Sequence, residues 1–241
     1  MSASRLFEEH LVGANAVLRR WVYRSPAVTG WLFGIRPSES SDVSYFEPGT
    51  LAMKRSLENV LRDGHRALEI GTGPQAILAL WASNRWRIDL TATEVDSAWS
   101  ESASRCAQRS NRKPHVECRN LLDGIAGEFD VIWFVPPFLS EEAFQRCREA
   151  RTASSAAEVG RLRRRSCGGE QGWELIDRFL QQAHDHLRDR GAVLVCINTF
   201  RQDTSKLVQC AARAGFCATL QRPLWPLPYV VMIGRPELAS K

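Results

Sequence analysis

Short apolar runs alternate with stretches of helical periodicity over residues 64–200, and turn residues flank each run. The candidate strands are Arg66–Ile70, Ile88–Thr93, Val116–Cys118, Phe129–Phe134 and Ala192–Asn198, with helical patterns between them at 74–85, 97–110 and 172–188. Such alternation is typical of βαβ units, in which right-handed helical crossovers join parallel strands. The chain is therefore predicted to be an α/β protein built on an open, mostly parallel sheet.

The end of the chain departs from this alternation. Two apolar runs, Phe216–Pro223 and Tyr229–Gly234, are separated only by Leu224–Pro228, which leaves no room for a helix. Runs so close together are expected to pair as an antiparallel hairpin. A seven-stranded, Rossmann-like sheet that ends in an antiparallel hairpin is similar to the fold of the class I methyltransferases.

The first 60 residues show helical spacing over 5–35, a polar loop at Pro37–Asp42 and a second helical pattern over 48–62, where Thr50 is a candidate N-cap. We therefore divide the chain into an N-terminal helical extension or lid, residues 1–60, and a ligand-binding domain, residues 61–241. The Arg- and Ser-rich segment 139–169 is predicted to be a flexible surface insertion.

Charge, cysteine content and the lengths of the apolar runs limit the partners and the cellular location that we expect for the chain. The 241 residues carry a net charge of only +5, too mild and dispersed an excess to suggest nucleic acid, which we do not expect as a partner. The seven cysteines form no C-x-x-C pair, so neither a metal site nor a disulfide framework is predicted. No apolar run reaches the roughly 18 residues of a membrane span, and the N-terminus lacks a signal-peptide core. These features indicate a cytoplasmic protein and leave its oligomeric state open.

The strongest chemical signal is the run LEIGTGP, where the first predicted strand turns into a helix. Gly71 and Gly73 permit a tight turn and the close approach of a ligand, and Pro74 suits the first helical position. The loop alone does not separate a dinucleotide from S-adenosylmethionine. Glu69 does so, because it can accept the α-ammonium group that only S-adenosylmethionine carries. Glu69, Gly71, Thr72 and Gly73 are therefore assigned to that ligand.

Two further strand ends supply polar residues. Glu94 follows the second strand. Its sequence spacing from the glycines suits an acid that accepts hydrogen bonds from both ribose hydroxyls. Asn120 and Leu121 follow the third strand, and the Asn120 amide can both donate to and accept from an adenine edge. We assign all three residues to the same ligand site.

The loop after the fourth strand reads Val135-Pro136-Pro137-Phe138. Open α/β sheets bind ligands outside the carboxyl ends of their strands, and a Pro-Pro pair there forms a stiff wall. Phe138 can stack on a substrate or face a sulfonium. These residues are the candidates for the reaction site.

From about residue 64 to 200 the chain resembles the N-methyltransferases that modify glutamine in peptide-chain release factors, and their amino-methylating relatives. The matching residues are Glu69, Gly71, Gly73, Glu94, Asn120, Leu122, Pro136, Pro137, Phe138 and the run Gly168–Gly172. The resemblance implies S-adenosylmethionine binding. The family has Asn or Asp before the Pro-Pro pair, to accept a hydrogen bond from the nitrogen being methylated, whereas this chain has Val135. Gln75 also stands where a third glycine is usual.

These departures favour methyl transfer to a small-molecule acceptor. One alternative is intramolecular cyclisation, in which the ligand's own amine attacks its γ-carbon to give azetidine-2-carboxylate and methylthioadenosine, as in bacterial enzymes that look like class I methyltransferases. The aromatic residues of the extension would then cover the ligand as a lid: Trp21, Tyr23, Trp31, Tyr45 and Phe46. Protein or RNA N-methylation and binding without catalysis remain open. An NAD-linked oxidoreductase is the last alternative, and Glu69 and the Pro-Pro pair argue against it.

Overall fold

The computed structural model describes residues 21–37, 44–149, 156–224 and 227–236. Its helices are α2 (Pro26–Phe33), α3 (Pro48–Val60), α4 (Ile77–Arg85), α5 (Ser97–Gln108), α6 (Glu141–Glu149), α7 (Ala156–Ser166), α8 (Glu174–Asp185) and α9 (Thr204–Arg213). Its strands are β1 (Arg66–Ile70), β2 (Asp89–Glu94), β3 (His115–Cys118), β4 (Phe129–Phe134), β5 (Leu187–Asn198), β6 (Phe216–Gln221) and β7 (Tyr229–Pro236). Most of the helix predicted over 5–35, and nearly all of the polar loop after it, lie outside the described residues.

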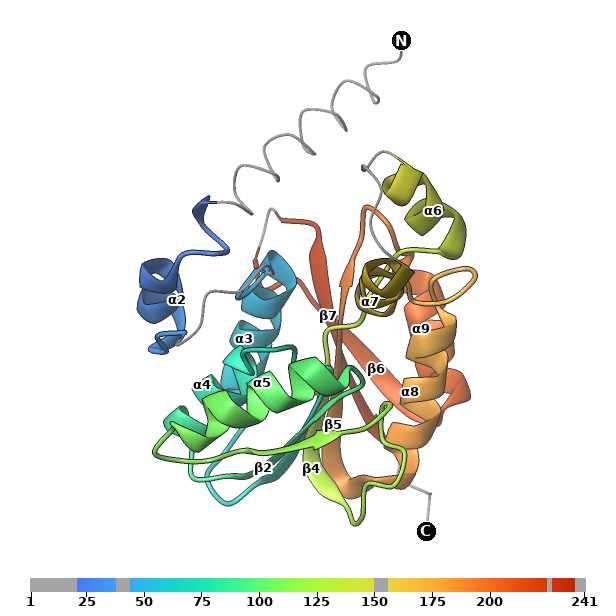
Figure 1. The fold of residues 1–241 in the computed structure, drawn as a ribbon. Helices are drawn as coiled ribbons and strands as arrows, with labels where there is room; N and C mark the ends of the chain where they lie inside the picture. Colours follow the sequence, from blue (N-terminus) through green and yellow to red (C-terminus); the bar gives the residue numbers. More distant parts are fainter. Residues whose placement is uncertain (1–20, 38–43, 150–155, 225–226, 237–241) are drawn as a thin grey trace.

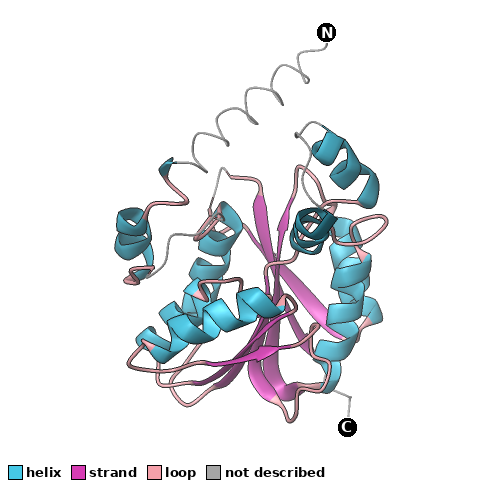
Figure 2. Ribbon diagram, in the orientation of Figure 1, coloured by secondary structure: helices cyan, strands magenta, loops and turns pink. Residues whose placement is uncertain are grey.

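The strands form one seven-stranded sheet in the order β3-β2-β1-β4-β5-β7-β6. The first five strands run parallel, and β7 pairs antiparallel with both β5 and β6. Figure 1 shows the sheet in the middle of the molecule with helices on both faces, and Figure 2 shows the same layers by element type. The predicted architecture, including the terminal antiparallel hairpin, is confirmed.

Two hydrophobic clusters fill the space between the sheet and its helices. One joins α3 and α4 to strand residues such as Trp133 and Leu194, and the other packs α8 and α9 on the opposite face. Met53 and Leu57 of α3 are fully buried in the first cluster. Residues 48–60, which the predicted boundary at residue 60 assigns to the extension, are therefore packed into the main core.

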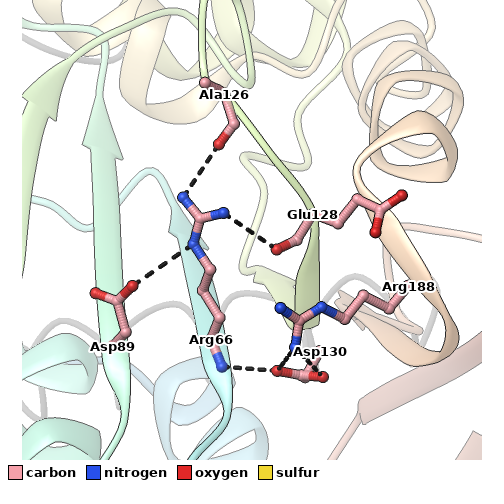
Figure 3. Close-up of polar contacts among 6 residues, drawn as sticks. All are labelled: Arg66, Asp89, Ala126, Glu128, Asp130 and Arg188. Atoms are coloured by element: carbon pink, nitrogen blue, oxygen red, sulfur yellow. Dashed lines mark hydrogen bonds and ion pairs between the residues drawn. The ribbon is translucent and has the colours of Figure 1, made fainter.

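Polar groups tie the strands together at the amino edge of the sheet (Figure 3). The Arg66 guanidinium donates to the carbonyl oxygens of Ala126 and Glu128 and forms an ion pair with Asp89 at 3.5 Å. Asp130 accepts from the Arg66 backbone at 2.7 Å and from Arg188 through both of its carboxylate oxygens. This network joins β1, β2, β4 and β5 at the end of the sheet opposite the glycine loop.

Several local predictions need correction. Helix α4 begins at Ile77 after an N-cap at Ala76, so Pro74 lies in the preceding turn rather than at the first helical position. Thr50 is not the N-cap of α3, because Glu47 holds that place and the Thr50 hydroxyl accepts from the Glu47 backbone at 3.1 Å in a capping box. The insertion at 139–169 contains helices α6 and α7. Helix α9 was not predicted.

Candidate active site

The glycine loop joins the carboxyl end of β1 to α4, next to the end of β2. Gly71 and Gly73 have φ values of 66° and 70°, a region that side chains rarely adopt. A Cβ at Gly71 would lie 3.2 Å from the Phe134 ring, whereas a Cβ at Gly73 would meet nothing within 4 Å. The Thr72 backbone N–H donates to the Thr93 carbonyl at 3.0 Å, which holds the loop against β2. The space beside Gly73 is therefore open to a ligand.

Glu69 is the last-but-one residue of β1 and is 4% exposed. Its carboxylate accepts from the Thr72 hydroxyl at 2.6 Å and from the Trp133 indole N–H at 3.1 Å. Burial raises the pKa of Glu69 to about 7, against the lowering effect of these two hydrogen bonds. Both donors are neutral, so they form hydrogen bonds to the carboxylate but do not neutralise its charge. Such a group is suited to bind a cation.

Glu94 ends β2 and is also buried, at 5% exposure. Its two carboxylate oxygens accept from the backbone N–H groups of Gly73 at 3.0 Å and Asp96 at 3.1 Å. Burial raises the pKa of Glu94, and the negative charge of Glu94 contributes to raising that of Glu69. Two buried carboxyl groups thus face the glycine loop from neighbouring parallel strands, and their assignment to a ligand site stays a prediction.

Asn120 and Leu121 follow β3 at the same edge. The Asn120 amide donates to Asp123 at 3.1 Å and accepts from Arg178 of α8 at 3.1 Å, so both of its polar atoms have partners within the protein. Leu121 is buried and has a φ of 54°, unusual for a residue with a branched side chain. The structure therefore places both residues near the ends of the strands, with the Asn120 side chain turned towards α8.

Residues 135–138 form the loop that follows β4 at the carboxyl end of the parallel strands. A Cβ at Gly49 would lie 3.3 Å from Val135 and 3.4 Å from Tyr229, so the Val135 side chain packs beneath the start of α3. Pro136 is buried and Pro137 is half-buried. Phe138 is also half-buried, and the Arg201 guanidinium lies 5.9 Å from its ring centroid.

The aromatic residues of the extension fall into two groups. Tyr23, Tyr45 and Phe46 are buried in the hydrophobic core, and the rings of Tyr23 and Phe46 lie 5.3 Å apart. Trp21 and Trp31 are 71% and 84% exposed. Core packing accounts for the first group, and the lid remains a prediction.

Two polar residues at this edge were missed by the sequence prediction. Asn198 ends β5 and pairs in register with Tyr229 at the start of β7. Burial raises the pKa of Tyr229 to about 12, as does the charge of Glu47, while a hydrogen bond from Asn198 lowers it. A polar residue at the end of a predicted parallel strand was the available signal for Asn198.

Arg164 was likewise missed, and it links α7 to the far side of the glycine loop. Its guanidinium donates to the Asp96 carboxylate at 2.9 Å, although α7 follows β4 and Asp96 follows β2. Asp96 also caps α5 by accepting from the backbone N–H groups of Ala98 and Trp99. This contact between residues 68 positions apart had no local signal in the sequence.

Comparisons with known proteins agree with this fold. No family model matches the chain. A ribosomal protein L11 methyltransferase of Bacillus velezensis is 28% identical over 172 residues, which cover 70% of this chain and 43% of that relative. The chain thus spans less than half of the relative's length.

Solved structures define the class of fold more fully. A methyltransferase of Pyrococcus furiosus matches with a TM-score of 0.66 and 23% identity, over 93% of this chain and 100% of that one. A 16S rRNA methyltransferase of T. thermophilus, in complex with AdoMet and guanosine, matches with a TM-score of 0.54 and 16% identity over 80% of this chain and 44% of that one. The fold of the present chain is that of the class I methyltransferases. Within the described residues, no helix is long and apolar enough to cross a membrane.

Proposed function

We propose that this protein is a methyltransferase that uses S-adenosylmethionine. The observation that carries the proposal is the pair of buried carboxyl groups, Glu69 and Glu94, that face an open glycine loop at the ends of β1 and β2. S-adenosylmethionine presents an ammonium group and two ribose hydroxyls, which match a buried carboxylate and a second carboxylate a strand away. The three similar proteins described above are named as methyltransferases, which supports the same proposal.

Each residue of the loop has a role in this proposal. Glu69 accepts the α-ammonium group, and the Thr72 hydroxyl fixes the carboxylate that does so. Glu94 accepts from the ribose hydroxyls through lone pairs not used by Gly73 and Asp96, because each carboxylate oxygen can accept two hydrogen bonds. Gly73 leaves room for the amino-acid arm.

The adenine ring is expected beside the ends of β2 and β3. Val95, which follows Glu94, is 44% exposed and offers an apolar surface to a flat ring. Leu121 is buried at the neighbouring strand end. Asn120 was predicted to reach the adenine through its side chain, and it would have to leave Asp123 and Arg178 to do so.

Bound S-adenosylmethionine supplies a methyl group activated by a positively charged sulfur. The Val135–Phe138 loop gives the reaction an apolar and partly rigid wall, which excludes water and limits how an acceptor can approach. The Val135 side chain accepts no hydrogen bond, so other groups at this edge must orient the methyl acceptor. Asn198 and Tyr229 are the polar side chains at the neighbouring strand ends.

A macromolecule fits the comparisons better than the small-molecule acceptor predicted from the sequence. One similar protein is named for ribosomal protein L11 and another for 16S rRNA. This favours the alternative of protein or RNA methylation, and it removes the ground for excluding nucleic acid as a partner. We therefore propose a macromolecular acceptor.

A second candidate function follows from the raised pKa of Glu69, about 7. An ionised Glu69 can take a proton from the ligand's ammonium group. The freed nitrogen would then form a bond to the γ-carbon while the bond from that carbon to sulfur breaks, which gives azetidine-2-carboxylate and methylthioadenosine. This is the self-cyclisation reaction considered from the sequence.

Titration calorimetry with S-adenosylmethionine and, separately, with NADH tests the proposed ligand. We expect saturable binding of S-adenosylmethionine with one site per chain and no binding of NADH. The reverse pattern would refute the assignment of Glu69. Mass spectrometry after incubation with S-adenosylmethionine alone then separates the two reactions, because only self-cyclisation gives azetidine-2-carboxylate together with methylthioadenosine above the background without enzyme.

A further inference from the structure

A shallow, open cavity of about 630 Å³ lies beside the reaction loop, and its lining contains none of the residues assigned to S-adenosylmethionine. It is lined by residues 199–204, which connect β5 to α9, and by Arg222 after β6. The Arg201 guanidinium, which lines the cavity, lies 5.9 Å from the ring centroid of Phe138. The cavity therefore borders the loop at which an acceptor would meet the methyl group.

The charge of this cavity is positive. Arg201 and Arg222 both line it, and neither forms an ion pair with any residue in the described part of the chain. The one acid in the lining is Asp203, whose carboxylate caps α9 by accepting from the Ser205 backbone at 2.8 Å. Two unpaired guanidinium groups against one engaged carboxylate favour an anionic ligand.

An aromatic ring stands at the same place. Phe200 lines the cavity and is 67% exposed, although a phenylalanine is usually buried. Its position is fixed by a tight turn, in which the Asn198 side chain accepts from the Phe200 backbone at 3.0 Å and the Asn198 carbonyl accepts from Arg201 and Gln202. The turn holds an exposed ring in the same lining as two cationic side chains.

Gln202 supplies a polar group to the same lining. It is 4% exposed, and its amide nitrogen donates to the Gly172 carbonyl at 3.3 Å. Its amide oxygen has no hydrogen-bond partner among the described residues. The Gln202 amide thereby joins the cavity lining to the segment at Gly172.

We propose that this cavity binds a nucleotide of single-stranded RNA and presents its base to the reaction loop. Phosphate oxygens pair with Arg201 and Arg222, and the base stacks on Phe200. Exposed aromatic rings beside cationic side chains are the usual elements of single-strand recognition. The inference rests on the proposed function, since it names the class of the macromolecular acceptor.

Fluorescence polarisation with a short, fluorescein-labelled single-stranded RNA of mixed sequence tests the inference. Wild-type protein is compared with Phe200→Ala and Arg222→Gln. We expect the loss of stacking at Phe200 to weaken RNA binding roughly five- to hundredfold. We expect Arg222→Gln to make the dependence of log affinity on log salt shallower by about 0.7, the value for one phosphate contact on a single strand.

Two control variants remove the same kinds of group elsewhere. Arg190→Gln removes an exposed arginine near the start of β5, whereas Asn198 ends the same strand. Val208→Ala trims an exposed apolar side chain on α9. Both controls should bind RNA as the wild type does. Equal losses in the controls and in the cavity variants would overturn the proposal.

S-adenosylmethionine binding is measured on every variant. If the protein binds S-adenosylmethionine but the wild type fails to bind RNA, the inference is wrong and the proposed function stands. If RNA binds but S-adenosylmethionine does not, the proposed function is wrong and the cavity is still an RNA site. A Phe200→Tyr variant, which keeps the ring, should restore RNA binding if Phe200→Ala acts through stacking. Displacement of the RNA by a polyglutamate peptide at equal charge would assign the cavity to an acidic protein instead.

Discussion

Replacing Glu69 by glutamine isolates the charge that the ligand site holds in the core. The substitution keeps the shape of the side chain and an oxygen that can accept from Trp133 or Thr72. It removes a carboxyl group whose pKa rises on folding from the ordinary 4.5 to about 7, chiefly because of burial. The variant therefore tests whether the buried charge of Glu69, which we assign to ligand binding, destabilises the folded protein.

The sign and size of the effect follow from proton linkage. Because the folded state holds the Glu69 proton more tightly than the unfolded state, the contribution of this group to stability is present below pH 4.5 and is lost as the pH rises to about 7. A pKa difference of about 2.5 corresponds to about 3 kcal/mol. Between pH 4.5 and pH 8, Glu69→Gln should therefore gain about 3 kcal/mol in unfolding free energy relative to the wild type.

Urea unfolding at a series of pH values measures this difference. Taking the change with pH cancels the cost of any hydrogen bond that glutamine replaces poorly, because that cost does not depend on pH. Glu58→Gln serves as the control, since Glu58 is exposed on α3 and forms an ion pair with Lys54 across one helical turn. A difference between Glu69→Gln and wild type that stays constant with pH, or one of opposite sign, would refute the reasoning.

Three other substitutions test the site. Glu94→Ala should weaken S-adenosylmethionine binding by at least tenfold in titration calorimetry, because it removes the ribose contact, and unchanged affinity would remove Glu94 from the site. Gly71→Val should abolish that binding and lower the melting temperature, because its Cβ meets Phe134 at 3.2 Å and its φ is 66°. Val135→Asn should cost about 1–3 kcal/mol in urea unfolding, because it places an amide in the apolar packing beside the start of α3. If Val135→Asn remains folded at no cost, the packing described for Val135 is incorrect.

Much of the fold could be predicted because apolar residues recur at a different spacing in strands than in helices. The apolar runs that became β1 and β4 were located to the residue, and the short spacing before Tyr229 indicated the hairpin. Boundaries were less exact where a turn intervened. Pro74 looked like a helix start, but the loop needs two more residues and a left-handed Ala76 before the chain can enter α4.

The site was predictable to the extent that its residues lie at strand ends. Glu69 and Glu94 could be placed together because neighbouring parallel strands finish at one edge. The ion pair of Arg164 with Asp96 could not, because it depends on where an insertion folds back over the sheet. The exposure of Phe200 was equally hidden, since a local pattern does not tell a displayed ring from a buried one.

Incubation with S-adenosylmethionine labelled in its methyl group, together with bacterial RNA and ribosomal protein, tests the central claim most directly. Both sulfur products are quantified in the same chromatogram, and the label is followed into macromolecules. The proposed function predicts that S-adenosylhomocysteine accumulates in step with label in the macromolecules, in the RNA fraction if the further inference also holds, and that Glu94→Ala abolishes both. Methylthioadenosine without S-adenosylhomocysteine, or bound ligand that never turns over in the presence of acceptor, would contradict the account.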